Sequence, residues 1–162
     1  MTSVSVDGTN SNPDGDFEIQ TGATLIAPDD FTIGGDFLNS GTITSSPSQL
    51  VFFSAAATGH EVDDGTGGFG VVDFLGVGGG WTLGSNFTTT GASTASFSIE
   101  AGTLNNGGFS ITGNGATDTF TVANGAFFEM SGTSAYPASF TTYTYGATST
   151  VRYLQTNGEP YM

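Results

Sequence analysis

Hydrophobic and polar residues alternate along most of the chain in short units of three. Each unit has an aromatic residue, then a small polar or acidic residue, then an aliphatic one, so both large side chains lie on one face of a short strand. The alternation therefore predicts many short, half-buried strands. The units are Phe17-Glu18-Ile19, Phe31-Thr32-Ile33, Trp81-Thr82-Leu83, Phe97-Ser98-Ile99, Phe109-Ser110-Ile111, Phe120-Thr121-Val122 and Phe128-Glu129-Met130.

A longer repeat is superimposed on this alternation. Residues 31–41 align with residues 81–91 without a gap, and an aromatic residue, Thr, an aliphatic residue, Gly, Asp or Asn, Phe and Gly recur in that order. Self-similarity of this kind is typical of stacked coils. Turn signals separate the strand units. They are Asn106-Gly107, Asn114-Gly115, Asn124-Gly125, Asn157-Gly158, Asp14-Gly15 and Asp64-Gly65.

Two all-β arrangements fit this pattern: a parallel β-solenoid with short coils, and a β-sandwich or jelly roll of hairpins. Asn-Gly pairs favour hairpins. The predicted strands, however, have only about three to five residues, whereas strands of globular sheets usually have about five or six. Gly and Asn also supply the positive φ angles that tight bends between coils require. We therefore predict a solenoid with coils of roughly 20–25 residues, and keep the sandwich as the alternative.

Several stretches resemble the repetitive coils of large secreted or cell-surface bacterial proteins of the adhesin and autotransporter-passenger kinds. They are residues 22–25, 31–44, 102–112 and 119–126. The resemblance covers about residues 20–155, and its motifs are compositional. It implies a right-handed parallel β-helix that is secreted or lies on a cell surface, and it implies no catalytic residue.

The pattern divides the chain into three parts. Residues 1–16 form an N-terminal strand and an acidic loop, residues 17–155 form the solenoid, and residues 156–162 form a tail. Residues 54–70 interrupt the rhythm and are the candidate for a loop excursion. The first residues lack the basic and apolar regions of a signal peptide, so we expect that a signal was removed or that the chain belongs to a longer protein.

The charge balance excludes several classes of partner. The chain has 15 acidic residues, Arg152 is its only basic residue besides His60, and the net charge is −14. Binding to nucleic acid or to an anionic membrane surface needs Lys and Arg.

No apolar run reaches the roughly 20 residues of a transmembrane segment, and the lack of cysteine excludes disulfides and thiolate chemistry. The 26 glycines disfavour helices. We expect an extracellular or cell-surface location.

One acidic segment matches the first half of a calcium-binding loop. Oxygen-bearing side chains alternate and are followed by Gly15, as in the start of such loops. The twelfth position holds Thr21 instead of the glutamate that binds calcium through two oxygens. Calcium is therefore the candidate cofactor, and a plain turn is the alternative. The candidate ligands are Asn10, Asn12, Asp14, Asp16 and Glu18.

Chemistry beyond calcium has little support in the sequence. His60, Glu61, Asp63 and Asp64 are the only cluster with varied titratable groups, and we interpret it as a solvated acidic loop. An alternative is a metal site or a general base. A lyase acting on acidic sugars would need cationic residues, and only Arg152 is available. We therefore predict that the protein is not an enzyme.

Three tyrosines near the C-terminus, Tyr136, Tyr143 and Tyr145, form a candidate binding strip for a glycan or another partner. The alternative is a ladder of aromatic rings inside the coil. Residues 149–154 and 3–6 both have strand patterns, and we expect them either to pair with further copies of the chain or to be covered by neighbouring coils of a longer shaft. The predicted function is a non-enzymatic extracellular structural protein, a subunit or segment of a surface filament, matrix or adhesin shaft. The alternative is a carbohydrate-binding adhesin or a module like that of a phage fibre.

Overall fold

The computed structural model describes residues 15–26, 30–43, 49–52, 58–65, 68–90, 95–114, 117–133 and 136–154, and these residues form a parallel β-solenoid. One wall is a seven-stranded sheet in the order β1-β4-β7-β9-β12-β15-β17. Its strands are β1 (Phe17–Ile19), β4 (Phe37–Asn39), β7 (Thr58–Asp63), β9 (Gly80–Leu83), β12 (Thr103–Asn105), β15 (Phe127–Met130) and β17 (Thr150–Tyr153).

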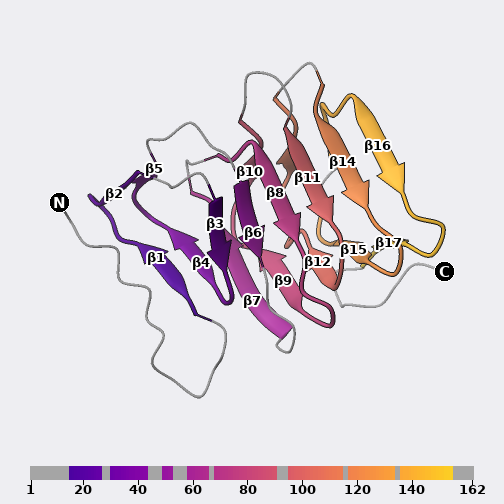
Figure 1. Ribbon diagram of the computed structural model, residues 1–162, viewed down its shortest axis with the longest axis horizontal. Coiled ribbons are helices and arrows are strands. Elements are labelled where there is room, and N and C mark those ends of the chain that lie inside the picture. Colours follow the sequence, from indigo (N-terminus) through magenta and orange to yellow (C-terminus); the bar gives the residue numbers. More distant parts are fainter. Residues whose placement is uncertain are drawn as a thin grey trace.

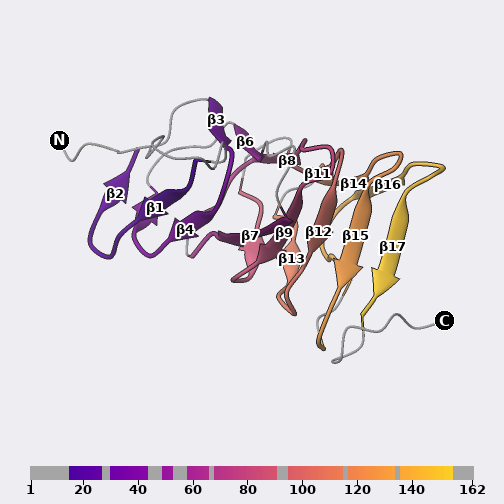
Figure 2. The same ribbon diagram turned by 90° about the horizontal axis from the view of Figure 1, so that it is seen from below.

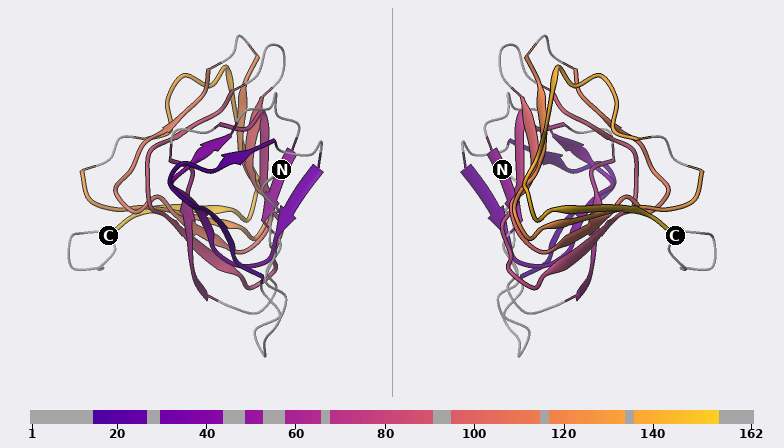
Figure 3. Two further views of the ribbon diagram at one scale, coloured as in Figure 1. Left: turned by 90° about the vertical axis from the view of Figure 1, so that its left-hand side faces the viewer. Right: turned by 90° about the vertical axis from the view of Figure 1, so that its right-hand side faces the viewer.

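A six-stranded sheet forms the second wall (Figure 1). Its strands are β3 (Asp30–Ile33), β6 (Gln49–Phe52), β8 (Val71–Phe74), β11 (Ser96–Ile99), β14 (Thr119–Val122) and β16 (Thr142–Tyr145). Two small pairs lie between the walls along the chain: β2 (Thr24–Leu25) with β5 (Thr42–Ile43), and β10 (Phe87–Thr88) with β13 (Ile111–Thr112). Figure 3 shows the resulting three-sided cross-section.

The solenoid prediction is confirmed, because every strand pair among the described residues is parallel and none of these residues is helical. A sandwich of hairpins would be antiparallel. The winding is right-handed. In Figure 1 the chain advances from left to right while the strands of the six-stranded sheet run downward, and Figure 2 places this sheet on the near side of that view.

Coil length varies along the seven-stranded sheet. Residues in matching positions on neighbouring strands are 20 to 25 residues apart. Between β7 and β9 the register shifts at Thr58 and His60, which marks an irregularity in β7. The segment 54–70 is the candidate for a loop excursion, but its residues 58–63 form β7 and therefore lie in the wall of the solenoid.

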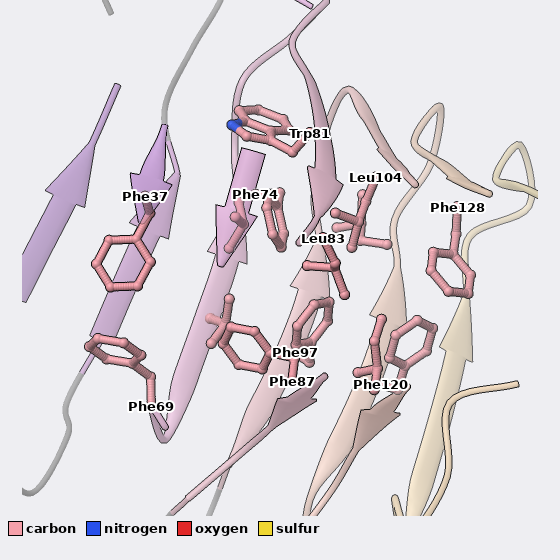
Figure 4. Close-up of a cluster of buried hydrophobic side chains, with 14 of the residues drawn as sticks. Phe37, Phe69, Phe74, Trp81, Leu83, Phe87, Phe97, Leu104, Phe120 and Phe128 are labelled. Atoms are coloured by element: carbon pink, nitrogen blue, oxygen red, sulfur yellow. The ribbon is translucent and has the colours of Figure 1, made fainter. Parts of the chain in front are cut away.

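Alternation within the strands fills the interior with rings (Figure 4). The aromatic and aliphatic members of each unit face inward, as in β14, where Phe120 and Val122 are buried. The rings of Phe97 and Phe120 stack with their centres 5.9 Å apart and their planes 14° apart. Stacking of equivalent residues on successive coils removes both faces of each ring from water, which is a large source of stability.

Asparagine and glycine together form the predicted corner at residues 106–107. Gly107 has a φ of +61°, and a Cβ there would lie 2.2 Å from the carbonyl oxygen of Leu83 on the preceding coil. The buried side chain of Asn106 accepts a hydrogen bond from the backbone N–H of Ser131 at 2.8 Å. The corner therefore needs glycine for both its conformation and its space.

One predicted strand unit differs from the structure. In Phe109-Ser110-Ile111, only Ile111 belongs to a strand, β13. The turn that starts at Asn106 still includes Phe109, whose N–H donates to the Asn106 carbonyl at 2.8 Å. A turn hydrogen bond therefore replaces strand pairing at this position.

Candidate functional site

The structure describes two of the five candidate calcium ligands. Asn10, Asn12 and Asp14 lie outside the described residues. Asp16 is exposed just before β1, and Glu18 is exposed on the outward face of β1. Calcium binding by this segment stays a prediction.

The structure brings Asp16 together with residues that the sequence analysis did not connect to it. The pairing of Phe17 with Phe37 places Asp16 beside Asp36 on the next coil. His60, on the coil after that, lies with its Nδ1 atom 3.2 Å from Asp36 Oδ1. Ligand atoms of all three side chains lie within 4.8 Å of one another.

These three side chains have two chemical roles open to them. Two carboxylates and an imidazole are donors that suit a divalent metal ion. The carboxylates also join neighbouring coils, because Asp16 Oδ1 accepts from the Asp36 N–H at 2.8 Å and Asp36 Oδ1 accepts from the Glu61 N–H at 3.0 Å. The sequence does contain a signal for the pair: Gly-Asp-Phe occurs at both 15–17 and 35–37.

Burial corrects the interpretation of residues 60–64 as a solvated acidic loop. Glu61 is exposed and Asp63 half-buried, but His60 and Asp64 are only 6% and 1% exposed. Burial raises the pKa of Asp64 to about 7, and the neighbouring Asp63 charge adds to the effect. Neither carboxyl oxygen of Asp64 has a hydrogen-bond partner among the described residues.

The candidate tyrosines lie at the C-terminal end of the described solenoid. Tyr143 pairs with Phe120 and continues its inward-facing column, with the ring centres 6.3 Å apart. Tyr145 continues the column of Val122. The ring of Tyr136 lies 5.8 Å from that of Tyr143, and burial followed by the charges of Tyr143 and Tyr153 raises the Tyr136 pKa.

This end differs from the coils before it. Phe120, Val122, Phe128 and Met130 are at most 1% exposed. The residues at the same positions of β16 and β17 are 37–48% exposed, because no described coil covers them. They are Tyr143, Tyr145, Val151 and Tyr153.

Arg152 lies on the outward face of β17. Its guanidinium forms an ion pair with Glu129 on β15, with Nε donating to Oε1 at 2.9 Å. Asn105 on β12 donates to the other oxygen of Glu129 at 3.3 Å. A polar row therefore crosses three neighbouring strands and ends at Arg152 on the edge.

No protein-family model matches the chain, and searches of curated proteins and of solved structures give no match either. The described residues contain no helix that is long and apolar enough to cross a membrane.

Proposed function

We propose that the protein is a non-enzymatic structural protein that assembles end to end, as a subunit or segment of an extracellular filament, matrix or adhesin shaft. The observation that carries the proposal is the C-terminal end, where core-facing aromatic residues are exposed on two parallel edge strands, β16 and β17. Elsewhere in the described solenoid, the next coil covers such residues.

Edge strands explain why a second copy would be a suitable partner. Each edge strand has backbone N–H and C=O groups that can pair with another strand. At the opposite end of the described solenoid the outermost strands are β1 and β3, and the core-facing Phe17 and Ile19 of β1 are buried in the single chain. Contacts between opposite ends are heterologous, and a heterologous contact that does not close into a ring produces a filament.

Composition supports an extracellular setting for such an assembly. A net charge of −14 with a single arginine keeps individual molecules apart at low ionic strength. Salt and divalent cations, which are abundant outside cells, weaken this repulsion. Assembly should therefore depend on ionic strength.

Sedimentation velocity over a range of protein and salt concentrations tests the proposal. We expect species larger than the monomer, and filaments in electron micrographs. Val151→Asp should abolish them because it places a charge on the exposed end of the core. Val77→Asp is the matched control, because Val77 is also an exposed valine but lies in the turn between β8 and β9. A monomer under all conditions would refute the proposal.

A second candidate function is glycan binding, favoured by the exposed rings of Tyr136 and Tyr143. Exposed aromatic rings can stack on the apolar faces of sugars. Screening of the protein on a glycan array, with Tyr136→Ala as the variant, tests this function. Binding by a discrete monomer that the variant loses would favour the second function over the first.

A further inference from the structure

We infer that Asn124 is a site of spontaneous covalent modification, at which the side-chain amide reacts with the backbone of Gly125 and is lost as ammonia. The sequence has four Asn-Gly pairs, and such pairs favour this loss because glycine has no side chain to hinder the attack. The structure describes both residues of two pairs, Asn124-Gly125 and Asn106-Gly107. It places the two pairs in opposite environments, so only the first is predisposed to react.

The reaction needs water and hydroxide from the solvent. Hydroxide removes the proton of the Gly125 N–H, and the lone pair of this nitrogen forms a bond to Asn124 Cγ. The Cγ–Nδ2 bond then breaks, and the departing nitrogen takes a proton from water and leaves as ammonia, which regenerates hydroxide. Water opens the resulting cyclic imide. Opening at Cγ gives aspartate, and opening at the backbone carbonyl carbon gives isoaspartate, whose main chain has an extra methylene group.

The surroundings of Asn124 leave the reacting groups accessible. Asn124 and Gly125 are both exposed in the turn between β14 and β15. The Gly125 N–H makes no hydrogen bond to a described residue, and a Cβ built on Gly125 would meet no atom within 4 Å. The Thr148 N–H on the next coil donates to Asn124 Oδ1 at 3.3 Å. This donor stabilises the negative charge that develops on the oxygen during the attack.

Asn106 accepts hydrogen bonds from the next coil as well, but its attacking group is held. Its side chain is 1% exposed, and its Oδ1 accepts from the N–H groups of Ser131 and Gly108 at 2.8 and 3.2 Å. The Gly107 N–H, which would have to attack, donates to Asn105 Oδ1 at 2.8 Å. Reaction at Asn106 therefore requires local opening of the corner, which costs free energy.

Isoaspartate at position 124 would disturb the last described coil. The turn that holds Asn124 packs directly on the turn between β16 and β17, because a Cβ built on Gly146 would clash with the Asn124 backbone nitrogen. No space is left there for an extra methylene group in the main chain. The longer turn should displace its neighbour and weaken β17, which begins with the Thr150 N–H donating to the Ala126 carbonyl at 3.0 Å.

Ageing of the full chain in mildly alkaline buffer, well below its melting temperature, tests the modification. Chymotrypsin cuts after aromatic residues, so the peptides that follow Phe97 and Phe120 contain Asn106 and Asn124, respectively. Fragmentation in a mass spectrometer assigns the mass gain of each amide-to-acid conversion to its residue. We expect Asn124 to convert at least about tenfold faster than Asn106, because only Asn106 must wait for local opening.

The same ageing in concentrated urea is the control for sequence effects. Unfolding exposes both pairs equally, so the two rates should become similar. Equal rates in the folded protein, or conversion of Asn124 in urea alone, would overturn the inferred site.

Hydrogen exchange of the peptide that covers β17 tests the effect on the last coil. The aged wild type should lose protection there. Asn124→Asp, which adds the charge without the methylene group, should keep it. So should aged Asn124→Gln, whose longer side chain closes a larger ring more slowly. Full protection in a wild type that contains isoaspartate would overturn this effect, and loss of protection in Asn124→Asp would overturn its assignment to main-chain length.

Discussion

Among single residues, Asp64 shows most clearly how burial changes the pKa of a side chain. Its neighbours in sequence are an exposed glycine and the half-buried Asp63, but its own side chain is buried without a hydrogen-bond partner among the described residues. A charged carboxylate in such a place is costly, so the folded protein prefers the neutral acid. Burial raises its pKa to about 7 from an ordinary value of 3.8.

The raised pKa predicts how stability depends on pH. Between about pH 4 and pH 7 the folded state keeps the Asp64 proton while the unfolded state releases it, so the contribution of this group to stability falls as pH rises and is level above pH 7. The full effect is roughly 4 kcal/mol. Asp64→Asn mimics the neutral acid, and should raise the melting temperature at pH 8 while changing it little at pH 4.

Asp63→Asn is the matched control for this experiment. It removes one charge from the neighbouring, half-buried position, and the new amide oxygen can still accept the Gly65 N–H. Burial is the larger cause of the raised Asp64 pKa, so this variant should retain most of the pH dependence. Thermal melts across the pH range measure both variants, and an Asp64→Asn protein with the wild-type slope would contradict the assignment.

At the scale of strands, two adjacent phenylalanines on β15 separate the effect of the face from that of the residue type. Phe128 is completely buried, whereas Phe127 is 39% exposed on the other face. Phe128→Ala leaves a cavity in the column of rings and should lower the free energy of unfolding by about 3–5 kcal/mol. Phe127→Ala should lower it by less than about 1 kcal/mol.

Denaturant unfolding followed by circular dichroism measures this difference. Because each coil contacts mainly its neighbours, a broader transition for Phe128→Ala than for the wild type would show that the coils unfold separately. Equal losses of unfolding free energy in the two variants would contradict the structure, in which Phe128 is on the buried face of β15 and Phe127 is on the exposed face.

For the whole molecule, the excess of negative charge should set the dependence on ions. A net charge of −14 favours the unfolded chain, in which like charges lie farther apart. Sodium chloride should raise the melting temperature by screening, and calcium at equal ionic strength should raise it further through binding to the folded state.

Two variants distinguish bound calcium from general screening. Asp16→Asn removes a carboxylate that belongs to both the predicted calcium segment and the cluster with Asp36 and His60. Glu100→Gln removes an exposed carboxylate between β11 and β12. Only the first should reduce the extra stabilisation by calcium. Equal responses in both variants, or no effect of a chelator, would leave screening as the whole explanation.

The sequence by itself determined the fold class. Alternation with a period of two depends on neighbouring residues, and the turn residues between units are equally local, so both can be read without knowing the tertiary structure. The unit Phe120-Thr121-Val122 faces the core as its pattern predicts, and Asn106-Gly107 forms a corner because only glycine suits its conformation.

Only the tertiary structure decided which coils bring which side chains together. Along the seven-stranded sheet, coil length varies from 20 to 25 residues, and the register shifts within β7, so no fixed period links Asp16 and Asp36 to His60. The burial of Asp64 and the exposure of Tyr143 likewise depend on whether another coil lies over them. Side-chain environments in a solenoid come from the neighbouring coils, and the alignment of those coils follows from the summed lengths of all the turns between them.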